Sequence, residues 1–544
     1  MAQIRDTCED TFIDKPINEK KRKCTKRFVS KIFCEYCSNT SIHGIGYLGA
    51  DDTCMTEKIW WLIVFTLSVV VCAILINKTW TKWQNTPVIM TFSHTQTPIW
   101  EIPFPAVTIC PVNKVQQSLY NYTQAYRNRN NLSEKESKKF WDISLVCDLV
   151  SSDINDDCEN ITNAAAVKSI VEVAPKLDET ILGIRWQDKN ILFGTEYFAP
   201  QLTEDGLCFT FNSLIGKDMY TEQLADSMIF EGHGKVNEGW TIEDGYQDDM
   251  DMTTYPERTA REGLLSGLSI VLASFANQKD YACGEPTSGY KLLLHNPAES
   301  PRASQHYIPI PVDKRVIIFV TPKLITTSKN VMYIPPETRN CYFSYEKTLR
   351  FYKMYTEDNC EIECLANVTQ QLCQCLPFYS PRDNKTDICG IGSTSCIEEA
   401  QERILKYDRM KKKGIIVERI QNQPDYQIFQ ECDCLPSCSS LHYSTESSQT
   451  NMHAMKTWEL SFNMPSESKG IEITDVYIAF KESDFMALRR SEMYGLTDFL
   501  GNCGGLLGLF MGFSFLSFLE IIYFVTLRIW CRIRNKKNTD ETVA

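Results

Sequence analysis

The sequence is poor in several features that mark common classes of protein. Basic residues are not in excess: 56 Lys and Arg against 69 Asp and Glu give a formal net charge of −13, which argues against nucleic acid as the main partner. Only seven histidines are present, and neither a G-x-S-x-G nor an H-E-x-x-H motif occurs, so we expect no enzyme activity, no metal site and no cofactor. The mean hydropathy of −0.26 excludes a protein that crosses a membrane many times. A chain of 544 residues can still contain a few membrane segments within that average.

Two long apolar runs do occur. Residues 59–76 carry no charged side chain, and at about 1.5 Å rise per residue they extend about 27 Å, enough for the hydrocarbon core of a bilayer. The run follows a polar stretch and lacks a small-residue cleavage site, so it predicts an anchored helix at 59–79 rather than a signal peptide. The second run, 499–530, has about 32 residues, more than one straight crossing needs. It must therefore tilt, break or project from the bilayer.

Lys and Arg residues are concentrated before the first run and after the second. Because such residues are enriched on the cytoplasmic side of a membrane, their positions set the expected orientation. Residues 1–58 and 531–544 are predicted to lie in the cytoplasm and 80–498 outside the cell. The outside segment contains fifteen of the 23 cysteines, in a compartment where disulfides form. A sequon at Asn39 falls on the cytoplasmic side and is predicted to stay unmodified. Five N-glycosylation sequons lie outside, at Asn121, Asn131, Asn160, Asn367 and Asn384.

The outside segment has no internal repeat and no low-complexity linker. Its apolar patterns predict both strands and helices, so we expect an α+β domain with a β core and helical appendages. Strands are expected at 269–275, 315–321 and 471–480. Helices are expected at 134–149, 344–354 and 398–413.

Ten cysteines lie between residues 341 and 438. Their C-x3-C and C-x-C pairs are compatible with a zinc array or with a ladder of disulfides. The oxidising compartment, and the fact that His442 is the one histidine nearby, favour the ladder. Such bridges restrict the unfolded chain and stiffen the element that carries them. Spacing alone does not assign the pairs.

The second apolar run contains two rows of glycines at helical spacing: Gly504, Gly508 and Gly512, and Gly501 with Gly505. Such rows let backbones approach closely, so simple pairing of anchor helices is one interpretation. Glu520 continues the first row, and a carboxylate in an apolar span is costly unless it faces water or a partner. An unwound turn at Phe513 and Ser514 would expose backbone carbonyls, which favours a cation pore. Two helices cannot enclose a pore, so a pore requires an oligomer.

Five segments, spread along the chain, resemble segments of one known family. They are His43-Gly44 in SIHGIGYLG, FPAVTIC at 104–110, GLCFTFN at 206–212, the ten-cysteine array, and LGNCGGLLGLFMGFSFLSFLE at 500–520. Together with two spans and internal termini, they resemble the degenerin/epithelial sodium channel superfamily, which includes the acid-sensing channels. The similarity covers nearly the whole chain. The phrases PIWEIPFPAVTIC and GYKLLLHNPAE are most similar to the insect pickpocket branch.

The resemblance implies a trimeric channel whose outside domain has a helical finger and a thumb at about 341–438. His43 and Gly44 would lie on a re-entrant cytoplasmic segment that affects opening. At Gly501 added bulk is expected to hold the pore open. The selectivity filter would consist of Gly512, Phe513 and Ser514. Other pore and gate residues would be Asn502, Gly505, Gly508 and, below the filter, Glu520.

The resemblance also implies disulfide pairs. It leaves Cys147, Cys158 and Cys283 without an assignment. The implied pairs are Cys110–Cys208, Cys341–Cys438, Cys360–Cys434, Cys364–Cys432, Cys373–Cys396 and Cys375–Cys389.

The sequence departs from the family at three places. Thr338 stands where the family often has a tryptophan that contacts the first span, and Asn502 replaces an aspartate of the acid-sensing channels. A long insertion between Cys396 and Cys432 prevents transfer of the acidic pocket of those channels. Proton gating therefore has no support from the sequence.

The function implied by the resemblance is an amiloride-sensitive, sodium-selective channel subunit of the plasma membrane, in sensory or epithelial cells. An extracellular stimulus, mechanical, chemical or a peptide, would open it. Its partners would be the bilayer, like or related subunits in a homo- or heterotrimer, and an extracellular ligand or matrix tether, with Na⁺ as the permeant ion. The alternative is a non-conducting accessory or receptor subunit that needs a partner to form a pore. A membrane-anchored enzyme is disfavoured.

Overall fold

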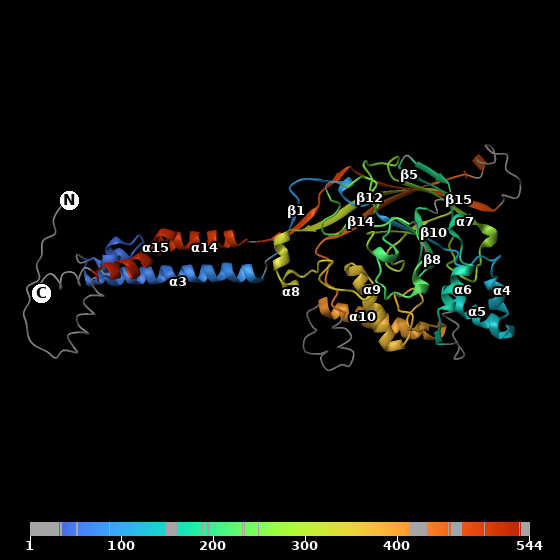
Figure 1. The fold of residues 1–544 in the computed structure, drawn as a ribbon, viewed down its shortest axis with the longest axis horizontal. Coiled ribbons are helices and arrows are strands. Elements are labelled where there is room, and N and C mark those ends of the chain that lie inside the picture. Colours follow the sequence, from blue (N-terminus) through green and yellow to red (C-terminus); the bar gives the residue numbers. More distant parts are fainter. Residues whose placement is uncertain are drawn as a thin grey trace, which may run out of the picture. The chain divides into compact units, whose positions relative to one another are not determined.

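The computed structural model describes residues 32, 35–50, 53–85, 88–147, 160–187, 189–192, 196–230, 232, 234–247, 250–412, 432–454, 456–457, 470–493, 495–532 and 534. The chain divides into two compact units. One consists of Met1–Ile89 with Glu492–Ala544, and the other of Met90–Ser491. Helices make up the first unit, and the second contains the sheets (Figure 1).

Two helical segments of the first unit lie side by side (Figure 1). Among the described residues, α3 (Met55–Asn85) is the one helix that alone has the length and composition to cross a membrane, and it extends beyond 59–79 at both ends. Helices α14 (Leu496–Met511) and α15 (Phe515–Tyr523) pass the same test only as a pair, bent by 70°. The second predicted segment, 499–530, is therefore a broken helix.

Eight strands among the described residues of the second unit form its larger sheet. The strands predicted at 269–275 and 471–480 are confirmed, and the two are neighbours in this sheet. Across the sheet the order is β1 (Val88–Phe92), β17 (Leu488–Glu492), β12 (Lys314–Thr327), β15 (Ile471–Phe480), β9 (Leu268–Phe275), β5 (Ile181–Trp186) and β6 (Lys189–Leu192). Strand β14 (Ser440–Asn451) pairs with β12 off this path.

Strand β12 is longer than the predicted 315–321. It pairs antiparallel with β14 along its length, from Lys314 opposite Asn451 to Ile325 opposite Ser440. Its first half also pairs parallel with β15, and its last three residues pair parallel with β17. Because both edges of β12 make ladder hydrogen bonds, the strand continues to Thr327.

A smaller sheet packs against the larger one. Its order is β11 (Ile308–Ile310), β10 (Tyr290–His295), β3 (Ala106–Pro111), β8 (Gly206–Phe211) and β7 (Phe198–Thr203). Buried side chains from both sheets form one core, in which the Phe104 ring contacts Trp186, Phe211 and Phe480. Two short ladders complete the strands: β13 (Ile388–Cys389) with β4 (Ile161–Thr162), and β16 (Asp484–Phe485) with β2 (Thr97–Pro98).

Most helices of the second unit lie on one side of this β core, the arrangement typical of an α+β domain (Figure 1). The helix predicted at 134–149 is α5 (Glu134–Ser144), and it begins where the Ser133 N–H donates to the Glu136 carboxylate at 3.1 Å. The helix predicted at 398–413 is α10 (Thr394–Lys412). The other helices are α4 (Tyr122–Arg127), α6 (Ala165–Val173), α7 (Leu177–Thr180), α8 (Pro336–Arg339) and α9 (Glu357–Cys373).

The helix predicted at 344–354 is wrong, because these residues form turns and bends. Three of their backbone N–H groups donate to a side chain of helix α9 instead of to carbonyls of the same segment. The Glu363 carboxylate accepts from the N–H groups of Arg350 (2.9 Å), Phe351 (2.6 Å) and Tyr352 (3.2 Å). A tertiary carboxylate thus replaces the intrahelical carbonyls, and the local helical pattern is overridden.

Seven disulfides join the described cysteines of the second unit. Six are the pairs that the resemblance implies. The seventh joins Cys147 to Cys283, two residues that the sequence left unassigned. Cys158, the fifteenth cysteine of the predicted outside segment, lies outside the described residues. Five of the seven bridges lie between residues 341 and 438. Three of them, made by Cys360, Cys364 and Cys373, tie both ends of α9 to the segments around it.

Candidate functional site

The break between α14 and α15 falls on Gly512, Phe513 and Ser514. Gly512 ends α14 in the left-handed conformation, with φ of 65°, and its N–H donates to the Gly508 carbonyl at 2.9 Å. Ser514 begins α15, where its hydroxyl accepts from the Ser517 N–H at 3.3 Å. The three residues expected to form a filter are thus the three that leave the helical conformation.

The predicted cytoplasmic motif lies directly against this break. The His43 N–H donates to the Met511 carbonyl at 2.9 Å, which satisfies one of the last carbonyls of α14. Gly44 follows with φ of 86° and begins α2 (Ile45–Gly49). A Cβ atom added at Gly512 would overlap the His43 imidazole. Glycine is therefore required at Gly512 by its backbone conformation and by the close approach of His43.

Ser41, which the sequence did not single out, joins the motif to Glu520. The Ser41 N–H and hydroxyl lie 3.3 and 3.2 Å from Glu520 Oε2. The Ser41 and Ser517 hydroxyl oxygens are 2.7 Å apart, and the Ser517 side chain is fully buried. The signal that could have drawn attention to Ser41 is its place two residues before the His-Gly pair.

Further along α15 the contact continues to the predicted cytoplasmic end. The rings of Tyr36 and Phe524 meet edge to face with centroids 5.4 Å apart. Phe524 begins a π-helical turn, Phe524–Arg528. The Glu35 carboxylate pairs through Oε1 with Arg528 and through Oε2 with Arg532, the latter at 2.5 Å. Arg528 and Arg532 are among the basic residues on which the predicted orientation rests, and they also bind Glu35, near the start of the described N-terminal segment.

Helices α3 and α14 contact each other through a face that is not the glycine face. The Ser68 hydroxyl donates to the Phe510 carbonyl at 2.6 Å, and the Trp83 ring stacks on Phe499 at 4.8 Å. Asn502 is exposed within the described chain. A Cβ atom added at Gly501, Gly504 or Gly505 would meet no described atom within 4 Å. This face of α14 therefore has room for neighbouring chains or for an aqueous path.

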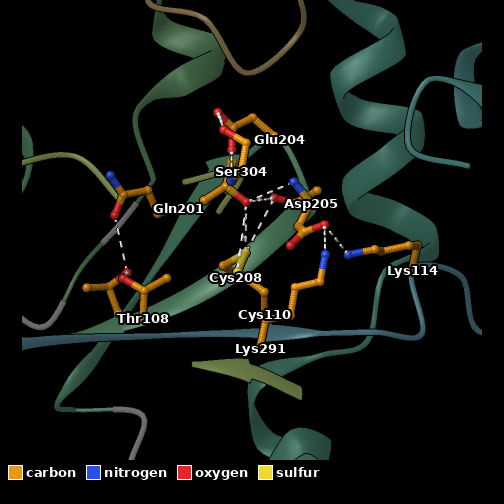
Figure 2. The surroundings of a disulfide bond; sticks show 12 residues. Thr108, Cys110, Lys114, Gln201, Glu204, Asp205, Cys208, Lys291 and Ser304 are labelled. Carbon is orange, nitrogen blue, oxygen red and sulfur yellow. Dashed lines mark hydrogen bonds and ion pairs between the residues drawn. A yellow bond between two sulfur atoms is a disulfide. The ribbon is translucent and has the colours of Figure 1, made fainter. Parts of the chain in front are cut away.

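In the second unit, the Cys110–Cys208 bridge lies beside a buried cluster of charges (Figure 2). Asp205, in the turn between β7 and β8, lies 3.0 Å from the ammonium groups of both Lys114 and Lys291. Burial alone would raise the pKa of the Asp205 carboxyl, but the two lysines outweigh burial and lower it. The cluster joins this turn to β10 and to the segment after β3.

The five predicted glycosylation sequons all lie in the second unit. The asparagine of each is exposed, and two lie in helices: Asn367 in α9 and Asn131 at the end of the 3-10 helix Arg129–Asn131. A sequon must be accessible to be modified, so each site is compatible with a glycan. Asn39 lies in the first unit, in the same N-terminal segment as Ser41.

The profile of one family, described as amiloride-sensitive sodium channel, matches residues 36–524. The chain belongs to this family. Members of the amiloride-sensitive sodium channel family are ion channels, so the protein is a channel protein and not an enzyme.

Relatives in the amiloride-sensitive sodium channel family match along most of the chain. Pickpocket protein 28 of Drosophila melanogaster is 28% identical over 540 residues, which cover 95% of this chain and 83% of the relative. Sodium channel protein Nach of Drosophila melanogaster is 22% identical, covering 92% of this chain and 88% of the relative. Acid-sensing ion channel 4-B of Danio rerio is 21% identical, covering 78% and 63%. The chain thus lies in the superfamily and near the pickpocket branch to which its motifs pointed.

Proposed function

We propose that the chain is a pore-forming subunit of a trimeric, amiloride-sensitive, sodium-selective channel of the plasma membrane. Both termini lie in the cytoplasm, and α14 with α15 forms a second, broken span. An extracellular stimulus, mechanical, chemical or a peptide, opens the channel in a sensory or epithelial cell. The observation that carries the proposal is the break at residues 512–514, with the His43 motif seated against it. Non-helical backbone at membrane depth is tolerated where it is buried in protein or lines a water-filled path.

The open glycine face of α14 supports assembly around a common path. Three copies that meet at Gly512, Phe513 and Ser514 would present backbone and hydroxyl oxygens to a dehydrated cation. Glu520 would lie below, where its negative charge favours cations over anions. The five bridges between residues 341 and 438 make the thumb stiff, so a stimulus on the outside unit can shift the population of open spans.

Substitution of Gly501 tests this proposal, because the structure leaves open space there. Gly501→Val should give a constitutive inward current in a cell that expresses the chain. The current should reverse near the sodium potential, fall when N-methylglucamine replaces sodium, and be blocked by amiloride. Leu67→Val is the control, since Leu67 is 62% exposed on α3, outside the glycine rows, and its change should leave gating as in the wild type. Absence of current despite surface delivery contradicts a pore formed by this chain alone.

The second candidate function is an accessory or receptor subunit. In this case the glycine face serves only for helix pairing with a conducting partner. Gly501→Val would then be silent alone but would change the current of a co-expressed relative. The two functions differ in whether this chain alone supplies the pore.

A further inference from the structure

Four residues of the described N-terminal segment contact the broken helix at its break and beyond. They are Glu35, Tyr36, Ser41 and His43, which we call the N-terminal splint. Going back along the splint from His43 to Glu35, the partners advance along the second membrane segment. They are Met511, then Ser517 and Glu520, then Phe524, then Arg528 and Arg532. The splint therefore runs antiparallel to α15 over its whole length.

The cytoplasmic end of the splint is held by a bridging carboxylate. Arg528 and Arg532 are one helical turn apart, and Glu35 pairs with one through each carboxylate oxygen. Charge-assisted pairs of this kind fix orientation as well as distance. The upper end is held by the backbone bond from His43 to Met511. With both ends fixed, Ser41 has little freedom to leave α15.

A chain of hydroxyl groups connects the helix break to Glu520 through Ser41. The Ser514 and Ser517 hydroxyl oxygens are 3.1 Å apart, and those of Ser517 and Ser41 are 2.7 Å apart. Ser41 then offers both its N–H and its hydroxyl to one oxygen of Glu520. Two donors on one carboxylate oxygen restrict the rotamer of Glu520 and leave its second oxygen for another partner.

We propose that Ser41 is a positioning residue of the ion path, which holds the Glu520 carboxylate in one orientation below the helix break. This inference rests on the proposed channel function. A fixed carboxylate presents one geometry to a passing cation and can distinguish ions of different radius. A carboxylate released from Ser41 adapts to either ion, so discrimination between sodium and potassium falls. The hydroxyl of Ser38, in the same segment, instead donates to the Glu35 carbonyl at 3.0 Å, which makes Ser38 a matched control.

The placement of Ser41 is tested without any current. Full-length protein carrying Ser41→Cys with Ser517→Cys is oxidised in membranes with copper phenanthroline, and crosslinked peptides are measured by mass spectrometry. Hydroxyl oxygens 2.7 Å apart predict rapid formation of a disulfide between these two positions. Ser38→Cys with Ser517→Cys should crosslink at least about tenfold more slowly. Equal rates for the two pairs overturn the splint.

The role of Ser41 is tested in the Gly501→Val background by reversal potentials in sodium and potassium. Ser41→Ala should lower the sodium-to-potassium permeability ratio about threefold or more, Ser41→Thr should restore it, and Ser38→Ala should leave it unchanged. If Ser41 acts through Glu520, Ser41→Ala added to Glu520→Gln should cause no further loss. An unchanged ratio in a conducting Ser41→Ala channel overturns this inference alone. Silence of Gly501→Val itself contradicts a pore formed by this chain alone, and this inference falls with it.

Discussion

At the scale of single residues, Gly512 carries two constraints at once. Its φ of 65° lies in the left-handed region, which costs an L-residue about 1–2 kcal/mol. Its Cα also faces the His43 ring so closely that a methyl group would overlap it. Relief of the second constraint requires movement of the His43 ring, beside the backbone bond from His43 to Met511. A methyl group at position 512 would therefore strain the helix break and also disturb the contact of the N-terminal splint with it.

Gly512→Ala should accordingly abolish most of the current while the protein still reaches the cell surface. The expected loss is at least about tenfold, because a shift of about 1.4 kcal/mol in a two-state equilibrium is a factor of ten. Whole-cell current normalised to biotinylated surface protein is the measurement. Leu67→Val is the control, since Leu67 is exposed on α3 and lies neither at the break nor in a glycine row. Equal currents from the two variants would show that the break does not depend on glycine.

The sequence predicted some of this site and missed the rest for physical reasons. The residues at the break could be predicted, since their type and the glycine row limit a helix locally. The contact of His43 with Gly512 could not, because packing brings together segments from opposite ends of the chain. Ser41 was missed for the same reason: a serine on a polar stretch carries no local signal until Glu520 is seen beside it.

At the scale of elements, a predicted helix or strand was correct where the local residue pattern and the tertiary contacts favour the same structure. Strand β15 alternates apolar residues and pairs in the centre of the sheet, so its bounds were predicted correctly. Residues 344–354 have a helical pattern, but the Glu363 carboxylate of α9 takes their backbone N–H groups. The bridge between Cys147 and Cys283 also depends on tertiary position, and no spacing rule could assign it.

The junction of β10 with the β7–β8 turn depends on the Asp205 carboxylate. Asp205→Asn would remove the carboxylate that Lys114 and Lys291 share, leaving Lys291 its pair with Glu285 at 2.6 Å, and should destabilise the second unit by about 3 kcal/mol. The Asp205 pKa is lowered in the folded protein, so its stabilisation is complete above the ordinary Asp pKa and is lost as pH falls toward the lowered value. The wild type should therefore lose stability on acidification below about pH 4, and the variant should lose less.

Thermal unfolding of the full chain in detergent, followed from neutral to acidic pH, measures this effect. Asp178→Asn is the matched control, because Asp178 is an exposed carboxylate in α7. The control should follow the wild-type pH curve. If Asp205→Asn and Asp178→Asn have the same stability at neutral pH, the ion pairs of Asp205 contribute nothing.

At the scale of the whole molecule, the two units differ in the chemistry they need. The first unit carries the apolar helices and the described cysteines that form no disulfide, whereas every described disulfide lies in the second. Disulfides persist in an oxidising compartment and thiols in a reducing one. This division matches a chain whose second unit lies outside the cell and whose N-terminal segment lies inside. The five exposed sequons of the second unit fall on the same side of the division.

Glycan mapping tests that topology directly. Treatment with peptide N-glycosidase should increase the gel mobility of the full chain, and Asn→Gln at each of the five sequons should remove one step of the shift. Asn39→Gln should leave the shift unchanged although Asn39 is exposed, because a cytoplasmic sequon never meets the lumenal transferase. A glycan on Asn39 would place the N-terminal splint outside the cell. The basic flanks would then have failed to set the orientation, and Ser41 could not hold Glu520 at the inner end of a pore.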